Sequence, residues 1–181
     1  MDEKPTLLAE QITTRKKYSV LLVAVTLIVA FDQCTKWLVR ENIPINTSWL
    51  PDSLNWLSPY ARITYIQNSG SSFGMFQNAK VFLAVLAVLI ILGAIYYVVT
   101  MDFVDDWTMA AAGLYIGGAI GNLIDRLSIG SVTDFVSVGT FYIFNVADAS
   151  INVSVAMLIL IVFIHERRKP TMSTPTEGEI S

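Results

Sequence analysis

Four long apolar stretches constrain the fold of this chain more than any other feature. A helix needs roughly 20 predominantly apolar residues to cross the hydrocarbon core of a bilayer. Stretches of about this length occupy residues 79–100, 107–127 and 141–164, and a shorter one begins at residue 18. We expect the first helix to continue through Asp32 and Lys36 to about Val39, because its purely apolar part is too short to span. With 54% of its 181 residues hydrophobic, the chain is predicted to be an all-α membrane protein with four transmembrane helices.

Basic residues flank the outermost stretches and predict the orientation. Residues 15–17 (RKK) precede the first stretch, and residues 167–169 (RRK) follow the fourth. The positive-inside rule therefore places both chain ends in the cytoplasm, although the acidic loop between the second and third stretches gives no support. Phe31-Asp32-Gln33 stands where a cleaved signal peptide would have small residues, so we interpret the first stretch as a retained helix.

The domain organisation follows from this topology. We expect a cytoplasmic tail over residues 1–17 and one four-helix membrane domain over residues 18–166. An extracytoplasmic insertion would occupy residues 41–78, and the Ser/Thr/Pro/Glu-rich residues 167–181 are typical of a disordered cytoplasmic tail. Within the insertion, residues 62–66 (RITYI) favour a strand, and a small extracytoplasmic sheet would fit there. Residues 68–74 (NSGSSFG) are either a plain hairpin turn or a place where the backbone approaches a ligand closely.

Four aspartates lie in or beside the apolar stretches: Asp32, Asp125, Asp134 and Asp148. Carboxylates at membrane depth are costly and rare, so each one is a functional-site hypothesis. The predicted topology brings all of them to one level, near the outer face of the membrane. This clustering favours a single site that faces outward over a relay that crosses the membrane.

Other polar residues fall on the same helix faces as these acids. Asp32 and Lys36 are one turn apart and can pair, either as a structural ion pair or in contact with a substrate. In the third stretch, Gly117, Gly118 and Gly121 favour close helix packing, and Gly118 shares a helix face with Asn122 and Asp125. The neighbouring Arg126 can bind a lipid headgroup or a carboxylate.

The fourth stretch carries a polar stripe formed by Asn145, Asp148 and Asn152, which we expect to point into the helix bundle. This stripe is either polar glue between helices or part of a carboxylate pair formed by Asp134 and Asp148. Two close carboxylates in a poor dielectric tend to share one proton, so one can act as a general base while the other donates. Such chemistry requires no cofactor. The sequence has one cysteine and one histidine, which argues against a zinc site.

Five motifs occur in order along the chain: residues 32–36 (DQCTK), 68–74 (NSGSSFG), 121–126 (GNLIDR), 132–135 (VTDF) and 144–148 (FNVAD). Together they resemble the bacterial lipoprotein signal peptidase (signal peptidase II) family of aspartyl proteases. The resemblance covers residues 18 to 164 and implies four helices with a small extracytoplasmic β-cradle. It matches Asp134 and Asp148 to the family's catalytic dyad. It matches the supporting or substrate-binding positions to Asp32, Lys36, Asn68, Gly70, Asn122, Asp125, Arg126 and Asn145.

The resemblance also implies a substrate and an inhibitor. The family removes signal peptides from diacylglyceryl-modified prolipoproteins in the bacterial inner membrane, cutting before the lipidated cysteine, and globomycin inhibits it. We therefore expect prolipoproteins, membrane lipids and globomycin as partners, with no metal, no nucleic acid and a monomeric state. Ser71 and Ser72 stand where the family usually has alanine, and Ser154 stands where it often has glycine. The stretch between Asp134 and Asp148 is short compared with many relatives.

Other functions are compatible with intramembrane acids. A proton-linked transporter would also use them, but their single level and the absence of a broken-helix repeat argue against it. A structural subunit would use the polar residues only to hold its helices together. The Gly-x-Gly-Asp signature of the presenilin and prepilin peptidase class is missing from the sequence.

Overall fold

The computed structural model describes residues 3–70, 80–100 and 105–168. Within these ranges, four helices are long and apolar enough to cross a membrane. They are α1 (Glu3–Asn42), α2 (Lys80–Thr100), α3 (Asp106–Ser128) and α4 (Val146–Arg168). The described strands are β1 (Ser48–Trp49), β2 (Ala61–Asn68) and β3 (Val132–Val138), and a short helical segment, η1 (Asp52–Leu57), lies between the first two. The prediction of four helices with a small sheet is confirmed.

Helix α3 packs against the other three helices. Glycines make this possible, because a Cβ at Gly113 would lie 2.6 Å from the Cβ of Ala24 on α1. On the opposite side, a Cβ at Gly118 would lie 2.5 Å from the carbonyl oxygen of Ala147 on α4. Small residues therefore let the backbones of α1, α3 and α4 approach closely, as expected for helices in lipid.

The lipid-facing surface explains why the helices are apolar on their outer sides. Large side chains such as Leu22, Leu89 and Ile159 are 60–66% exposed on the isolated chain. Such a surface suits hydrocarbon rather than water, so the chain is a multi-pass membrane protein.

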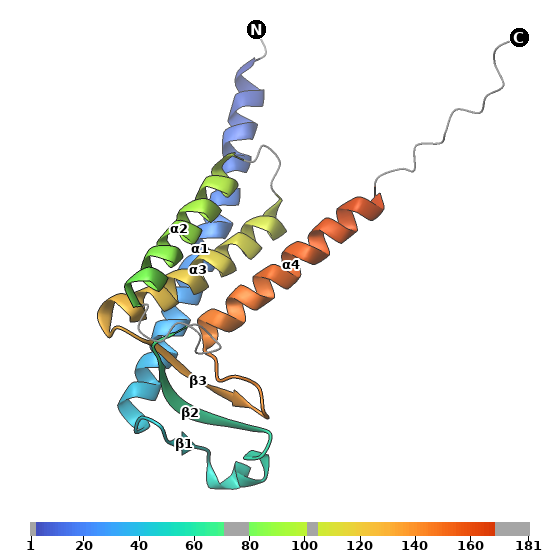
Figure 1. The fold of residues 1–181 in the computed structure, drawn as a ribbon. Helices are drawn as coiled ribbons and strands as arrows, with labels where there is room; N and C mark the ends of the chain where they lie inside the picture. Colours follow the sequence, from blue (N-terminus) through green and yellow to red (C-terminus); the bar gives the residue numbers. More distant parts are fainter. Residues whose placement is uncertain (1–2, 71–79, 101–104, 169–181) are drawn as a thin grey trace, which may run out of the picture.

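The sheet lies at one end of the helix bundle, where it covers the end of α1 (Figure 1). Its strands are antiparallel in the order β1-β2-β3, and Ile66 of β2 pairs with Asp134 of β3. Val39 and Ile43 from the end of α1 form a small core with Tyr65 and Phe135 from the sheet. This core attaches the sheet to the bundle at the level of the acids.

The fourth helix begins later than predicted. Phe144 pairs with Val136 of β3 and exchanges backbone hydrogen bonds with it, so residues 141–145 are not helical and Phe144 bridges to the sheet. Because α4 starts at Val146, Asp148 lies in the first helical turn instead of two turns inside the helix. Asn152 is exposed and does not face the bundle, so the prediction of its inward orientation was wrong.

Candidate functional site

Two carboxylates come from different elements at the junction of sheet and bundle. Asp134 lies in β3 and is 3% exposed, and Asp148 lies in the first turn of α4. Asp134 accepts hydrogen bonds from the side-chain amides of Asn68 (2.9 Å) and Asn145 (2.7 Å). Asp148 accepts from the side-chain amide of Asn122 (2.8 Å). Neutral amide groups therefore hold both acids.

Asn145 links the two acids. Its side-chain oxygen accepts from the backbone N–H of Asp148 (3.0 Å), which is the arrangement of a residue that caps a helix N-terminus. Its side-chain amide donates both to Asp134 Oδ1 and to Asn122 Oδ1 (3.1 Å). Asn145 is fully buried, so its rotamer and its contacts fix Asp134 relative to the start of α4.

The surroundings of Asp134 raise the pKa of its carboxyl group. Burial, and next the neighbouring Asp148 carboxylate, raise the pKa of Asp134 from 3.8 to about 7. The amides of Asn68 and Asn145 oppose this shift, because they stabilise the charged form. A carboxyl group with such a pKa can take up or release a proton near neutral pH, as general acid–base catalysis requires.

A buried ammonium organises the other two acids. Lys36 is fully buried, and its Nζ lies 2.8 Å from Asp32 Oδ2 and 3.5 Å from Asp125 Oδ2. It also donates to Asn122 Oδ1 (2.9 Å), so Lys36 touches a residue that holds Asp148. Asp32 accepts from the backbone N–H of Ala147 (2.9 Å), where a carboxylate stabilises the N-terminus of α4. The predicted pairing of Asp32 with Lys36 is present.

Asp125 connects the bundle to β3. Its Oδ2 accepts from the backbone N–H of Thr133 (2.8 Å), the residue before Asp134. Its Oδ1 accepts from Arg40 (3.3 Å) and from Gln33 (3.4 Å). Gln33, Arg40 and Thr133 were not among the predicted site residues. The spacing of Arg40 one turn after Lys36 was the available signal in the sequence.

The remaining predicted residues lie around this centre. Gly70 donates its backbone N–H to Asn68 Oδ1 (3.0 Å), which orients the amide that reaches Asp134. Arg126 donates to the carbonyl oxygen of Asn122 (3.3 Å) and interacts electrostatically with Asp125, Asp134 and Asp148. The unusual Ser154 donates to the carbonyl oxygen of Ala111 on α3 (2.7 Å), so its hydroxyl ties α4 to α3. Ser71 and Ser72 lie outside the described residues.

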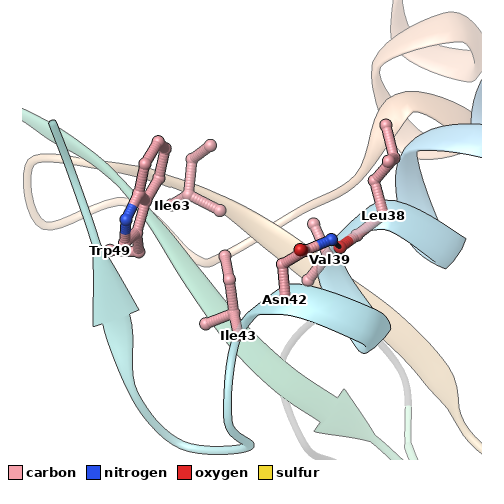
Figure 2. A pocket seen from close by; sticks show the side chains of 6 residues that line it. All are labelled: Leu38, Val39, Asn42, Ile43, Trp49 and Ile63. Atoms are coloured by element: carbon pink, nitrogen blue, oxygen red, sulfur yellow. Dashed lines mark hydrogen bonds between the residues drawn. The ribbon is translucent and has the colours of Figure 1, made fainter.

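Two grooves lie near the site. One has a volume of about 470 Å³ and lies between α2 and α3, with Arg126 among otherwise apolar or glycine lining residues that include Val85 and Leu123. The other, of about 430 Å³, lies between the end of α1 and the sheet and is lined by Leu38, Val39, Asn42, Ile43, Trp49 and Ile63 (Figure 2). No acid lines either groove, and within the described ranges no group of three or more His, Cys, Asp or Glu side chains could hold a metal ion.

The fold and the site together define a multi-pass membrane protein with a pair of carboxylates, of which Asp134 is buried and Asp148 is half-buried. The family model for signal peptidase (SPase) II matches residues 24–164, so the chain belongs to this family and is a protease. The lipoprotein signal peptidase of Streptococcus thermophilus is 37% identical over 146 residues, which cover 80% of this chain and 92% of that protein. Those of Streptococcus pneumoniae and Symbiobacterium thermophilum are each 33% identical and cover 80% and 83% of this chain, and 93% and 97% of their own lengths.

Solved structures share the fold. Two structures, described as a bacterial membrane enzyme determined by the in meso method, superpose with TM-scores of 0.74 and 0.71. They are 24% and 25% identical and cover 90% and 84% of this chain, and each is itself covered to 95%. These comparisons support the predicted family and do not support the alternative of a proton-linked transporter.

Proposed function

We propose that this protein is an aspartyl endopeptidase that removes the signal peptide from diacylglyceryl-modified prolipoproteins, cutting before the lipidated cysteine. Asp134 and Asp148 are the proposed catalytic pair. The observation that carries the proposal is that both acids are joined through Asn145 and held by neutral amides, with the pKa of Asp134 raised to about 7. Membership of a signal peptidase family supplies the substrate class.

The formal charges around the pair balance when the pair carries one proton. Among the described residues, four carboxylates gather here, and three cations lie among them: Lys36, Arg40 and Arg126. One proton shared by Asp134 and Asp148 would bring this group to neutrality. Two neighbouring carboxylates that share a proton are the arrangement that aspartic proteases use.

The proposed reaction uses this shared proton. The ionised acid removes a proton from a water molecule, whose oxygen attacks the carbonyl carbon of the scissile peptide bond. The protonated acid donates its proton to the carbonyl oxygen, which prevents negative charge from building up there. The resulting tetrahedral diol collapses when the amide nitrogen receives a proton from the pair, and the peptide bond breaks. The proton returned from the diol hydroxyl restores the pair to its starting state.

The lipid on the substrate would position the scissile bond. The groove between α2 and α3 is apolar and has Arg126 among its lining residues, so it can accept an acyl chain while the guanidinium contacts a polar part of the substrate. Arg126 donates a hydrogen bond to the backbone carbonyl oxygen of Asn122, and the side chain of Asn122 donates to Asp148. A substrate anchored in the bilayer would thus present its peptide bond at the depth of the acids, which lowers the entropic cost of reaction.

The proposal includes a location and partners. The basic residues at 15–17 and 167–169 favour both termini in the cytoplasm, which would put the sheet and the acids at the outer face of the inner membrane. We further propose that the protein acts as a monomer together with membrane lipids. Globomycin is expected to inhibit it by occupying the site around Asp134 and Asp148.

Single isosteric substitutions test the assignment. Asp134→Asn and Asp148→Asn, purified in detergent, should each lower cleavage of a diacylglyceryl-modified prolipoprotein by at least about 1,000-fold, because each removes half of the acid–base pair. The matched control is Asp52→Asn on the exposed η1 segment, which should retain wild-type activity. Substantial cleavage by either dyad variant would refute the assignment of that acid. Wild-type cleavage that globomycin does not reduce would refute the inhibitor proposal.

A further inference from the structure

Arg40 joins three elements beside the proposed catalytic pair. It lies one turn after Lys36 and two turns after Asp32 on α1, so the three residues share a helix face. Its Nη1 lies 3.3 Å from Asp125 Oδ1 on α3 and donates to Thr133 Oγ1 on β3 at 3.1 Å. Its side chain is 24% exposed, and the Asp125 side chain is 1% exposed. Most of the ion pair is therefore shielded from water.

Thr133 connects Arg40 to the proposed catalytic acid Asp134. It is fully buried and immediately precedes Asp134 in β3. Its backbone N–H donates to Asp125 Oδ2, and its hydroxyl accepts from Arg40. Successive side chains of a strand point to opposite faces, so fixing both the backbone and the side chain of Thr133 determines the direction in which Asp134 points.

Without Arg40, fewer contacts would hold this part of β3. Asp125 would keep Thr133 by one backbone hydrogen bond, and its own Oδ1 would lose the guanidinium. The pairing of β2 with β3 is irregular between Ile63 and Ile66, close to the partner of Asp134, so the sheet alone constrains this position less than a regular ladder would. Arg40 adds a contact to this part of β3 from the bundle side.

We propose that Arg40 is a positioning residue, which holds Thr133 and Asp125 so that Asp134 keeps the geometry needed for catalysis with Asp148. The inference rests on the proposed proteolytic function. Arg40 acts through Thr133 and does not touch the reacting atoms. A displacement of about 1 Å can cost roughly 100-fold in rate, so loss of Arg40 should act on the chemical step.

The test separates positioning from plain structural support. Arg40→Ala should lower kcat by about 10- to 100-fold while KM for the lipidated substrate changes by less than about twofold. Arg40→Lys should recover part of that loss, because an ammonium can reach one oxygen but lacks the planar fork of a guanidinium. Arg62→Ala is the matched control, since Arg62 lies in β2 and donates to the Ser58 carbonyl oxygen away from the acids. It should leave kcat unchanged.

A double-variant comparison gives a second readout. Thr133→Val removes the hydroxyl but keeps the size of the side chain, and should lower kcat by about three- to tenfold. If Arg40 acts through Thr133, the double variant should be no slower than Arg40→Ala alone, because the shared interaction is already lost. Multiplied losses, an unchanged kcat for Arg40→Ala, or a loss confined to KM would each overturn the inference. If Arg40→Ala does not fold, the kcat values of Arg40→Lys and Thr133→Val decide the question by the same criterion.

The controls keep this inference apart from the proposed function. Cleavage by the wild type and its loss in Asp134→Asn establish the function first. If the wild type does not cleave the lipidated substrate, the proposed function fails and the inference fails with it. If the wild type cleaves, Asp134→Asn is inactive and Arg40→Ala is fully active, only the inference about Arg40 fails.

Discussion

Replacement of Lys36 by methionine tests the reasoning about the buried cluster most directly. Methionine keeps the unbranched apolar stem but removes the ammonium group. That ammonium lies 2.8 Å from Asp32 and 3.5 Å from Asp125, and it donates to Asn122 at 2.9 Å. Lys36 and Asp32 are both fully buried, so the variant would leave a carboxylate in the protein interior without its cation.

The expected loss of stability follows from what remains. Breaking a buried ion pair by removing one partner costs about 3–5 kcal/mol. Asp32 would keep the backbone N–H of Ala147 and the amide of Gln33, and Asp125 would keep Arg40. We therefore expect the lower end, about 3 kcal/mol, which for a chain of this size lowers Tm by about 6–12 °C.

Thermal unfolding in detergent, followed by circular dichroism, measures this loss. The double variant Asp32→Asn/Lys36→Met removes both charges and should recover at least half of the Tm decrease. Lys16→Met is the matched control, because Lys16 and its partner Asp106 are 73% and 50% exposed, and it should change Tm by less than about 2 °C. A Tm for Lys36→Met within 2 °C of the wild type would refute the argument. So would a double variant that is less stable than the single one.

Two further predictions concern the packing of α3 and the protonation of Asp134. Gly118→Ala should lower stability by about 1–3 kcal/mol and reduce cleavage, because its Cβ would meet the Ala147 carbonyl oxygen at 2.5 Å, whereas Gly93→Ala, with nothing within 4 Å, should lose neither. The pKa of Asp134 is raised from 3.8 to about 7, so the folded state binds the proton more tightly than the unfolded state. Its contribution to stability should therefore fall by at most about 4 kcal/mol between pH 4 and pH 7. Tm measured against pH should show this slope, and Asp134→Asn should reduce it.

The helices and the acids could be predicted because their signals are local. An apolar stretch long enough to span a bilayer is visible in the sequence without knowledge of its neighbours. The pairing of Asp32 with Lys36 was equally accessible, because both residues lie on one helix at a spacing of four. The motif order then separated Asp134 and Asp148 from the other acids through resemblance to a known family.

The parts that sequence reasoning missed depend on contacts between distant segments. The role of Arg40 is visible only when α1, α3 and β3 are brought together, because its partners are 85 and 93 residues away in the chain. The start of α4 was misplaced because residues 141–144 are hydrophobic, as in a membrane-spanning helix, while Phe144 in fact pairs with β3. The spacing of Asn152 from Asn145 and Asp148 predicted that it faces the bundle, but in the structure Asn152 is exposed.

The four acids differ in the groups that hold them. Asp32 and Asp125 contact cationic side chains, Lys36 and Arg40, and they also accept backbone N–H groups that fix α4 and β3. Each of these two acids is therefore held both by a cation and by the backbone of a second element. Asp134 and Asp148 instead accept from the amides of Asn68, Asn122 and Asn145, which orient a carboxyl group without neutralising it. Lys36 connects these two pairs of acids. It donates a hydrogen bond to Asn122 Oδ1, and the side-chain nitrogen of Asn122 donates to Asp148. Through the Asn122 side chain, Lys36 is thus linked to the proposed catalytic acid Asp148, in addition to its ion pairs with Asp32 and Asp125.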